Sequence, residues 1–478
     1  MKQFDFTEDE IRGVPPGRLL TMEIEFTLAC NYRCPYCYAT GKGLPKDELS
    51  EEEIRSALKQ AQELGARKII ILGGEPLIYP KLTEMIDYIS ELDMAVEIFT
   101  NGEFLTEELA AFFKNRNCRV AVKFNSFKEE IHDKMTGRKG SLGIAMRTIE
   151  RLLNAGYRDM PDMLCASTVL STENLEEAPE LWRFLRSKGI TPYFECLTPQ
   201  GRMLENPGLL PDPDDVKRIF DELARIDGGY GYEWIPQPPL AGDCCFRHAY
   251  SCVVHSNGDV TPCVGLALVI GSIRTSPFGE IIRNSKTVQR LKNYRQYIKS
   301  PCRECEKIDH CYGCRGTAWQ LTGDYLAADP TCWRNKGKKI TALPADASPY
   351  LPHKPPIVMI SKILSLSDTG GRILAEMNED TPFMKADGIL EPSSIPELAA
   401  QSVAVVNGFL TPDNIPPGIL AETSRLKLFA PIRSGEQIIT EFHSDSDFPP
   451  WHIVSFRITS SSGERKAEGV LKLCVPDE

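Results

Sequence analysis

Three cysteines near the amino terminus are close enough in sequence to hold one metal centre. Cys30, Cys34 and Cys37 lie in the stretch "FTLACNYRCPYCYATG" with the spacing Cys-x3-Cys-x2-Cys. A zinc site would need a fourth ligand nearby, and a disulfide framework would need an even number of cysteines. Three thiolates on one loop can instead hold three irons of a [4Fe–4S] cluster and leave the fourth iron open to a small molecule.

A glycine-rich turn follows the next strand-like segment, and it strengthens this interpretation. Gly73-Gly74-Glu75-Pro76 comes directly after the apolar run "KIIIL". Glycine lets a backbone approach a ligand closely, and a carboxylate suits a cationic ammonium group. The cysteine loop, with Tyr36 before its third cysteine, and this turn together resemble the radical S-adenosylmethionine (radical SAM) family.

The resemblance implies a defined chemistry. The open iron would bind the amino and carboxylate groups of S-adenosylmethionine, an electron from the cluster would cleave the sulfonium, and a 5′-deoxyadenosyl radical would abstract hydrogen from the substrate. It also implies contacts to the ribose, carboxylate and adenine from residues after later strands, although each of these residues could instead cap a strand end. They are Thr100, Asn101, Asn125, Ser126 and Thr168.

Two charged residues are candidates for catalytic roles. Glu195, in "YFECLTPQGR", is expected to face the barrel mouth, and Lys123 lies inside an apolar strand-like run. Each has an ordinary alternative: a strand-end carboxylate is often solvated, and a lysine can extend its ammonium group out of an apolar surface.

A second cysteine array runs from residue 244 to residue 332 and resembles the SPASM extension of radical SAM enzymes. Paired Cys-x2-Cys motifs also suit zinc, which is the alternative. The resemblance implies two auxiliary iron–sulfur clusters, expected to be [4Fe–4S], with interleaved ligands. One would use Cys245, Cys263 and Cys314 with Cys252 as candidate fourth ligand, and the other Cys302, Cys305, Cys311 and Cys332.

The remaining cysteines receive simpler interpretations. Cys252 sits in a strand-like run and could equally be a buried thiol, and Cys244 is expected to stay free beside Cys245. The scattered cysteines are expected to be small buried hydrophobes. They are Cys118, Cys165, Cys196 and Cys474.

Six strand-like segments alternate with helical patterns between residues 20 and 200, which predicts a parallel sheet with right-handed crossovers. One predicted helix opens with Ser50 and Glu53 as a capping box, and another presents an apolar face from Leu142 to Leu153 that includes Met146. Polar residues follow most of these strands. They converge on one site only if the sheet curves, so we expect an α/β fold with an open partial (βα)6 barrel.

The chain is expected to contain four segments. Residues 18–205 would form the barrel, 206–240 a linker with a short helix, 241–340 the SPASM domain, and 350–478 an α+β domain. That last part resembles the hotdog fold of hydroxyacyl-carrier-protein dehydratases.

Within the hotdog-like part, Glu397 matches the acidic residue of those dehydratases and could equally favour the helix start through the helix dipole. Residues 385–388 stand where their histidine turn is expected, so no base is visible for dehydration. The sequence therefore predicts acyl binding, carrier docking or homodimerisation in place of dehydratase activity.

Composition and charge argue against several classes of protein. The 478 residues carry a formal net charge of −11, which argues against nucleic acid as a partner, and no apolar run is long enough to span a membrane. The acidic, polar amino terminus is not a secretory signal, so a cytoplasmic location is expected.

The function predicted is oxidative modification of a peptide or acyl-carrier-linked substrate, with a flavodoxin or ferredoxin-type electron donor. Two alternatives remain open, an iron–sulfur electron carrier and an acyl-binding assembly protein, neither of which would turn over S-adenosylmethionine. Anaerobic incubation with S-adenosylmethionine and dithionite separates the enzyme from the electron carrier, and absence of iron after anaerobic reconstitution would favour the acyl-binding protein.

Overall fold

The chain folds into two compact units. The first comprises Met1–Leu321 and Ala328–Lys339, and the second comprises Thr322–Ala327 and Ile340–Glu478. No helix in the part of the chain that is described is long and apolar enough to cross a membrane. The computed structural model describes residues 3–40, 47–242, 244–412, 415, 417–448 and 450–475.

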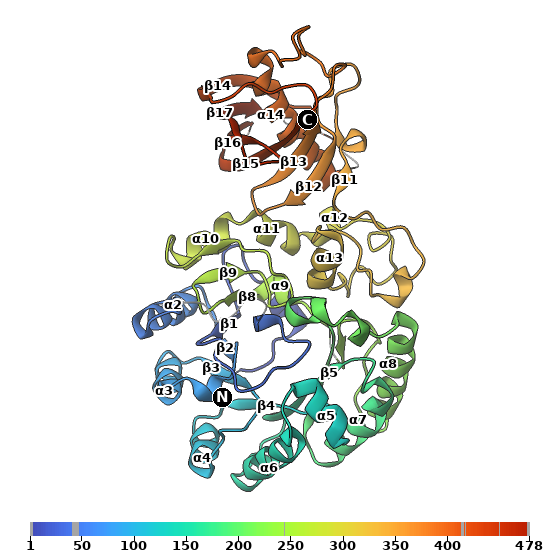
Figure 1. Ribbon diagram of the computed structural model, residues 1–478. Helices are drawn as coiled ribbons and strands as arrows, with labels where there is room; N and C mark the ends of the chain where they lie inside the picture. The colour runs from blue at the N-terminus through green and yellow to red at the C-terminus, as the bar shows by residue number, and fades with distance from the viewer. Residues whose placement is uncertain are drawn as a thin grey trace. The chain divides into compact units, whose positions relative to one another are not determined.

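The first unit is built on a ten-stranded sheet with the order β10-β9-β8-β1-β2-β3-β4-β5-β6-β7. Its central strands β1 to β6 run parallel in sequence order, and helices α2 to α8 cover their outer side (Figure 1). This confirms the predicted open barrel of six β–α units. The strands are β1 (Thr21–Glu25), β2 (Lys68–Leu72), β3 (Ala95–Thr100), β4 (Arg119–Lys123), β5 (Leu164–Leu170) and β6 (Thr191–Cys196).

The helices form where their caps and apolar faces predict them. Ser50 and Glu53 make the capping box of α2, and each side chain accepts a hydrogen bond from the other residue's backbone N–H. In α6, Met146 is 41% exposed and does not belong to the apolar face predicted for it. The covering helices are α2 (Glu51–Glu63), α3 (Leu82–Glu91), α4 (Glu107–Asn115), α5 (Glu129–Thr136), α6 (Ser141–Asn154), α7 (Ala178–Ser187) and α8 (Pro213–Gly228).

Strands from the cysteine-rich segment extend the barrel sheet, which the sequence did not reveal. Strand β8 (Ser251–Val254) pairs in parallel with β1, and β7 (Leu240–Ala241) pairs antiparallel with β6. The sheet therefore joins the cysteine-rich segment to the β1 edge of the barrel, while β7, just before that segment, extends the β6 edge. The other elements here are β9 (Asp259–Thr261), β10 (Gly271–Ser272), α9 (Arg247–Tyr250), α10 (Phe278–Asn284), α11 (Lys286–Lys292), α12 (Tyr294–Tyr297) and α13 (Arg315–Thr322).

The amino-terminal segment before α1 (Glu8–Arg12) packs against the amino ends of the barrel strands. The Arg119 guanidinium donates two hydrogen bonds to the Asp5 carboxylate, at 2.8 and 2.6 Å, and lies over the Phe4 ring. Only 10% of the Arg119 side chain is exposed, so the two hydrogen bonds to Asp5 offset part of the cost of burying its charge.

The second unit is an antiparallel seven-stranded sheet, in the order β11-β12-β13-β15-β16-β17-β14, packed on helix α14 (Ile395–Leu410). This confirms the hotdog-like arrangement. The run of β-forming residues that starts at Ile357 becomes strand β12 only from Lys362, because Gln401 of α14 bonds the backbone of Ile357 and Met359 instead. The strands are β11 (Ala345–Asp346), β12 (Lys362–Leu366), β13 (Gly370–Glu376), β14 (Ile419–Leu428), β15 (Gln437–Phe448), β16 (Trp451–Ser460) and β17 (Arg465–Cys474).

Candidate functional site

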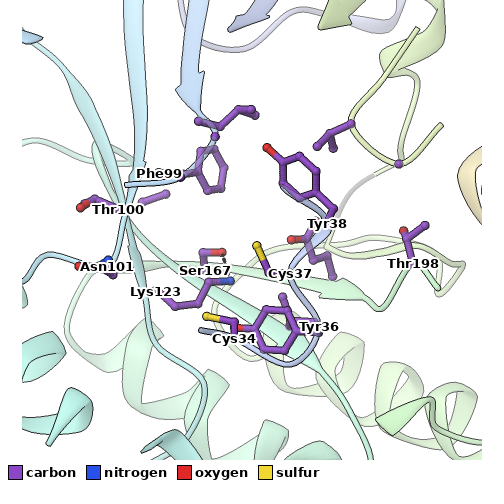
Figure 2. A pocket seen from close by; sticks show the side chains of 18 of the residues that line it. Cys34, Tyr36, Cys37, Tyr38, Phe99, Thr100, Asn101, Lys123, Ser167 and Thr198 are labelled. Carbon is purple, nitrogen blue, oxygen red and sulfur yellow. Dashed lines mark hydrogen bonds between the residues drawn. The ribbon is translucent and has the colours of Figure 1, made fainter. Parts of the chain in front are cut away.

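The three loop cysteines line one cavity at the carboxyl ends of the barrel strands. Cys30, Cys34 and Cys37 share this cavity of about 240 Å³ with the turn after β2 and with side chains of β4 to β6. Figure 2 shows Cys34 and Cys37 on one side of the space, and Thr100 and Asn101 on another. The sequence-predicted loop and turn therefore meet at one site.

Close backbone contacts hold the cysteine loop on three sides. A Cβ at Gly74 would lie 2.2 Å from the Ala29 carbonyl oxygen, and one at Gly137 would lie 2.4 Å from that of Arg33. On the third side, a Cβ at Gly201 would lie 2.3 Å from the Cys37 carbonyl oxygen. These glycines are thus required by contacts within the chain, beyond any contact with a ligand.

Glu75 joins the turn to the end of the next strand. Its carboxylate accepts hydrogen bonds from the Thr100 hydroxyl at 2.5 Å, the Asn101 N–H at 2.8 Å and the Leu77 N–H at 3.1 Å. Burial is the largest influence on this carboxyl and raises its pKa to about 7, against the lowering effect of these hydrogen bonds. Glu75, Thr100 and Asn101 all line the cavity, together with Gly73 and Gly74.

Lys123 reaches into the cavity from the end of β4 (Figure 2). Its ammonium donates a hydrogen bond to Ser167 at 3.1 Å and lies 5.6 Å from the centre of the Tyr36 ring. Burial lowers the pKa of Lys123, while Glu195 and the thiols of Cys34 and Cys37 act in the opposite direction. The Lys123 amine therefore lies near both the cysteine loop and Glu195.

A second group of polar side chains lines the cavity on strands β1 and β6. Glu195 and Tyr193 come from β6, and Glu23 of β1 is only 1% exposed. Arg247, from α9, hydrogen-bonds Tyr193, and its Nε lies 3.8 Å from Glu23 Oε1. That Glu23 oxygen is buried and makes no hydrogen bond. Sequence reasoning identified Glu195 here and missed the other three, because Arg247 reaches the barrel only through the sheet extension.

Four residues predicted to bind the cofactor do not line this cavity. Thr168 donates a hydrogen bond to the Phe124 carbonyl, because side chains alternate along β5 and its neighbours Ser167 and Val169 face the cavity. Asn125 donates to the Tyr36 hydroxyl and thereby positions that ring. Ser126 donates to the Glu177 carboxylate, and Pro76 starts a short buried turn. These four residues support the site from outside.

The auxiliary cysteines separate into two spatial groups. The charges of Cys245 and Cys314 raise the pKa of Cys263, whose burial is the larger cause. Burial and the charge of Asp329 raise the pKa of Cys332 most, and the charges of Cys311 and Cys302 raise it further. The interleaved ligand sets expected from the sequence remain a prediction.

Cys252 lies apart from both groups. It pairs with Met22 across β8 and β1, is fully buried in the hydrophobic core, and its pKa is raised by that burial. This is the environment of a core thiol, so the structure corrects its assignment as a ligand.

The donors present fit polynuclear clusters. Among the described residues no three His, Cys, Asp or Glu side chains converge closely enough to hold a single metal ion. Each thiolate of a [4Fe–4S] cluster binds a different iron, so its ligands are more widely spaced than those of a mononuclear site. Soft thiolate donors also favour iron–sulfur clusters over Mg²⁺ or Ca²⁺.

The second unit holds a polar pair at the start of α14. His353 Nε2 lies 3.6 Å from Glu397 Oε1, and Gln401 donates a hydrogen bond to the same oxygen at 2.9 Å. His353 Nδ1 is buried without a hydrogen-bond partner. A histidine therefore does lie beside Glu397, although not in the turn where a catalytic histidine was expected. The histidine comes from "LPHKPP", well before the turn in which it was sought.

Family models cover most of the chain. Residues 24–185 match the Radical SAM superfamily, residues 244–306 match SPASM, an iron–sulfur cluster-binding domain, and residues 345–477 match ApeP dehydratase. The three resemblances inferred from motifs are confirmed.

Individual relatives match the first two of these regions. An AdoMet-dependent heme synthase of Methanosarcina barkeri is 29% identical over 348 residues, covering 66% of this chain and 96% of the relative. A PqqA peptide cyclase of Bradyrhizobium diazoefficiens is 25% identical over 358 residues, covering 69% and 87%. Streptococcus suis SuiB, solved with the precursor peptide SuiA, shares the fold with a TM-score of 0.52 and 14% identity, covering 66% and 76%.

Proposed function

We propose that the chain, whose residues 24–185 match the Radical SAM superfamily and whose residues 244–306 match SPASM, cleaves S-adenosylmethionine reductively and oxidises a peptide or carrier-linked substrate. Enzymes of this superfamily use S-adenosylmethionine with a [4Fe–4S] cluster, and SPASM domains bind auxiliary clusters. One observation carries the proposal: Cys30, Cys34, Cys37 and Glu75 line a single cavity.

Bound S-adenosylmethionine would supply the radical chemistry of the reaction once its sulfonium is reduced by one electron. Cys30, Cys34 and Cys37 would hold three of the irons. Glu75, Thr100 and Asn101 would orient the bound molecule from the strand ends, and the buried surroundings would limit the access of water.

The opposite wall of the cavity would contact the substrate. Glu195, Tyr193, Arg247 and Glu23 present charged and hydrogen-bonding groups there, and Glu23 Oε1 has no hydrogen-bond partner. A buried polar atom without a partner is costly, and a ligand that donates to it removes that cost. Lys123 lies between the two walls and would orient both bound molecules.

A peptide is the substrate we favour, and the homology to a PqqA peptide cyclase supports it. The heme synthase relative favours a small molecule instead. The hotdog-like unit supports the carrier-linked version, because acyl thioesters are substrates of such domains. An external electron donor of the flavodoxin or ferredoxin type would reduce the first cluster.

The test is product analysis of protein reconstituted without oxygen and supplied with dithionite and S-adenosylmethionine. We expect 5′-deoxyadenosine and methionine in equal amounts. Glu75→Gln should weaken S-adenosylmethionine binding at least tenfold, while Glu176→Gln, an exposed glutamate outside the cavity, should leave it unchanged. Iron incorporation without any 5′-deoxyadenosine would favour the electron-carrier alternative.

A second candidate function belongs to the second unit, and the His353–Glu397 pair supports it. We propose that this unit dehydrates a 3-hydroxyacyl thioester. His353 would remove the α-proton, and the hydroxyl would leave with a proton relayed through Glu397, so that water leaves and an α,β double bond forms. Gln401 would hold Glu397 in place.

A further inference from the structure

The auxiliary group of Cys245, Cys263 and Cys314 lacks an evident fourth thiolate in its own part of the chain. Cys252 is buried in the hydrophobic core. Cys244 accepts a hydrogen bond from the Gln237 amide at 2.7 Å, and the same amide donates to the His310 carbonyl. This places Cys244 beside the residue that precedes Cys311, a member of the other group.

Three chain segments meet where the missing ligand would lie. A Cβ at Gly265 would lie 3.5 Å from the Thr198 hydroxyl and 3.8 Å from the Gly316 Cα, and a Cβ at Gly316 would lie 2.3 Å from the Gly265 carbonyl oxygen. Gln200 also donates a hydrogen bond to the Val264 carbonyl at 2.9 Å. The segment after β6 is therefore in direct contact with the segments that follow Cys263 and Cys314.

Cys196 is the last residue of β6, two residues before this meeting point. Its N–H donates to the Pro239 carbonyl at 2.8 Å, and β6 pairs with β7, which ends four residues before Cys245. Cys196 also lines the cavity that contains Cys30, Cys34 and Cys37. Burial is the first cause that raises its pKa well above the ordinary value, followed by the charges of Asp329, Cys314, Glu195 and Cys332, so Cys196 is near a member of each auxiliary group, and the chain contacts above favour the group of Cys263 and Cys314.

We propose that Cys196 is the fourth thiolate ligand of the auxiliary cluster held by Cys245, Cys263 and Cys314. The neighbouring carboxylate of Asp329 is already committed, because one oxygen accepts from the Cys314 N–H at 2.8 Å and the other from Thr331 at 2.9 Å. The sequence grouped Cys196 with the buried hydrophobes, since its partners lie far away along the chain.

This ligand would anchor the auxiliary cluster in the wall of the reaction cavity. Glu195, the adjacent residue of β6, lines the same cavity. An electron leaving an oxidised substrate would then have a short route to the cluster. The ligands of this auxiliary cluster do not depend on the identity of the substrate or on cleavage of S-adenosylmethionine, so they can be tested separately.

The test compares single Cys→Ala variants of the full chain, reconstituted without oxygen, by iron analysis and by EPR spectroscopy after reduction. Cys196→Ala should change or remove the same auxiliary signal as Cys263→Ala and lose up to about a third of the bound iron, since one of three [4Fe–4S] clusters is affected. The signal lost in Cys305→Ala should remain. Cys196→Ser, which keeps the size and offers an oxygen ligand, should retain more iron with a shifted spectrum.

Two single Cys→Ala variants serve as controls. Cys252→Ala and Cys244→Ala should both leave the signal unchanged. The proposal is overturned if Cys196→Ala has wild-type iron and wild-type spectra, if it removes the signal that Cys305→Ala removes, or if Cys244→Ala abolishes the Cys263 signal in its place.

Discussion

Gly74 lies so close to Ala29 that a Cβ at position 74 would come within 2.2 Å of the Ala29 carbonyl oxygen. The same oxygen accepts a hydrogen bond from the Glu75 N–H at 2.8 Å, and Gly74 donates to the Thr27 carbonyl at 2.9 Å. The turn after β2 and the start of the cysteine loop therefore form one rigid unit. The geometry of the thiolates depends on this turn as well as on the loop itself.

Gly74→Ala is expected to displace the cysteine loop. Backbone atoms cannot move aside as a flexible side chain can, so the free energy of unfolding should fall by about 1–3 kcal/mol, the usual cost of overpacking. Iron at the first cluster should fall with it, measured by EPR in protein carrying intact auxiliary cysteines. Gly208→Ala is the control, because no atom lies within 4 Å of a Cβ there. An unchanged iron content in Gly74→Ala would contradict the described contact.

Lys123→Met should make the first cluster harder to reduce. The ammonium lies near the cysteine loop, and a positive charge stabilises the reduced, more negative cluster. The reduction potential should shift to a more negative value, and S-adenosylmethionine cleavage should slow on the order of tenfold, as expected for about 1.4 kcal/mol in activation free energy. Lys123→Arg, which keeps the charge, should restore part of the potential. A potential equal to that of the wild type in Lys123→Met would show that this charge is not felt at the cluster.

Asp5→Ala is expected to destabilise the first unit. It leaves the nearly buried Arg119 guanidinium without its carboxylate, at a cost of about 1–2 kcal/mol after allowing for the exposure of Asp5. Urea unfolding of the apoprotein measures this loss. In the double variant with Arg119→Met the two effects should be less than additive. Additive losses would mean that the two side chains do not interact.

His353→Ala should abolish dehydration of a 3-hydroxyacyl thioester by the full-length protein. Glu397→Gln should reduce it at least a hundredfold, because an amide cannot relay a proton to the departing hydroxyl as a carboxyl group can. Lys354→Ala, at the exposed neighbouring position, should retain activity. The assay follows formation of the conjugated thioester by its absorbance. Equal activity in His353→Ala and the wild type would show that His353 is not the base of this reaction.

Much of the fold could be predicted because its signals are local. The capping box of Ser50 and Glu53 and the period of apolar residues after it lie within a few residues of one another. The same holds for the β-forming runs of both units. The parallel pairing of β8 with β1 could not be predicted, because it joins residues more than two hundred positions apart with no motif to mark the partner.

Site residues that belong to a short sequence motif could be predicted. Site residues that enter the cavity from distant parts of the chain could not. Cys30 and Glu75 follow from short patterns, whereas Arg247 enters the cavity from a distant segment. Thr168 was assigned from its place near a strand end, but the alternation of β5 turns it away. Counting the alternation from Ser167 could have corrected that prediction.

His353 and Cys196 illustrate the same limit for isolated residues. His353 has no pattern around it that resembles a known catalytic turn, and only the packing of residues 353–361 on α14 brings it near Glu397. Cys196 stands about fifty residues before the cysteine array that it approaches in space. Chemistry assembled from distant segments requires the tertiary structure.

The most direct test of the account is reductive cleavage of S-adenosylmethionine by a variant in which Cys30, Cys34 and Cys37 are all replaced by Ala. The wild-type protein, reconstituted without oxygen and reduced with dithionite, should yield 5′-deoxyadenosine. The triple variant should yield none, while iron bound by Cys302 and its neighbours persists as about two thirds of the wild-type content, since two of three clusters remain. Undiminished 5′-deoxyadenosine from the triple variant would contradict the assignment of this cavity.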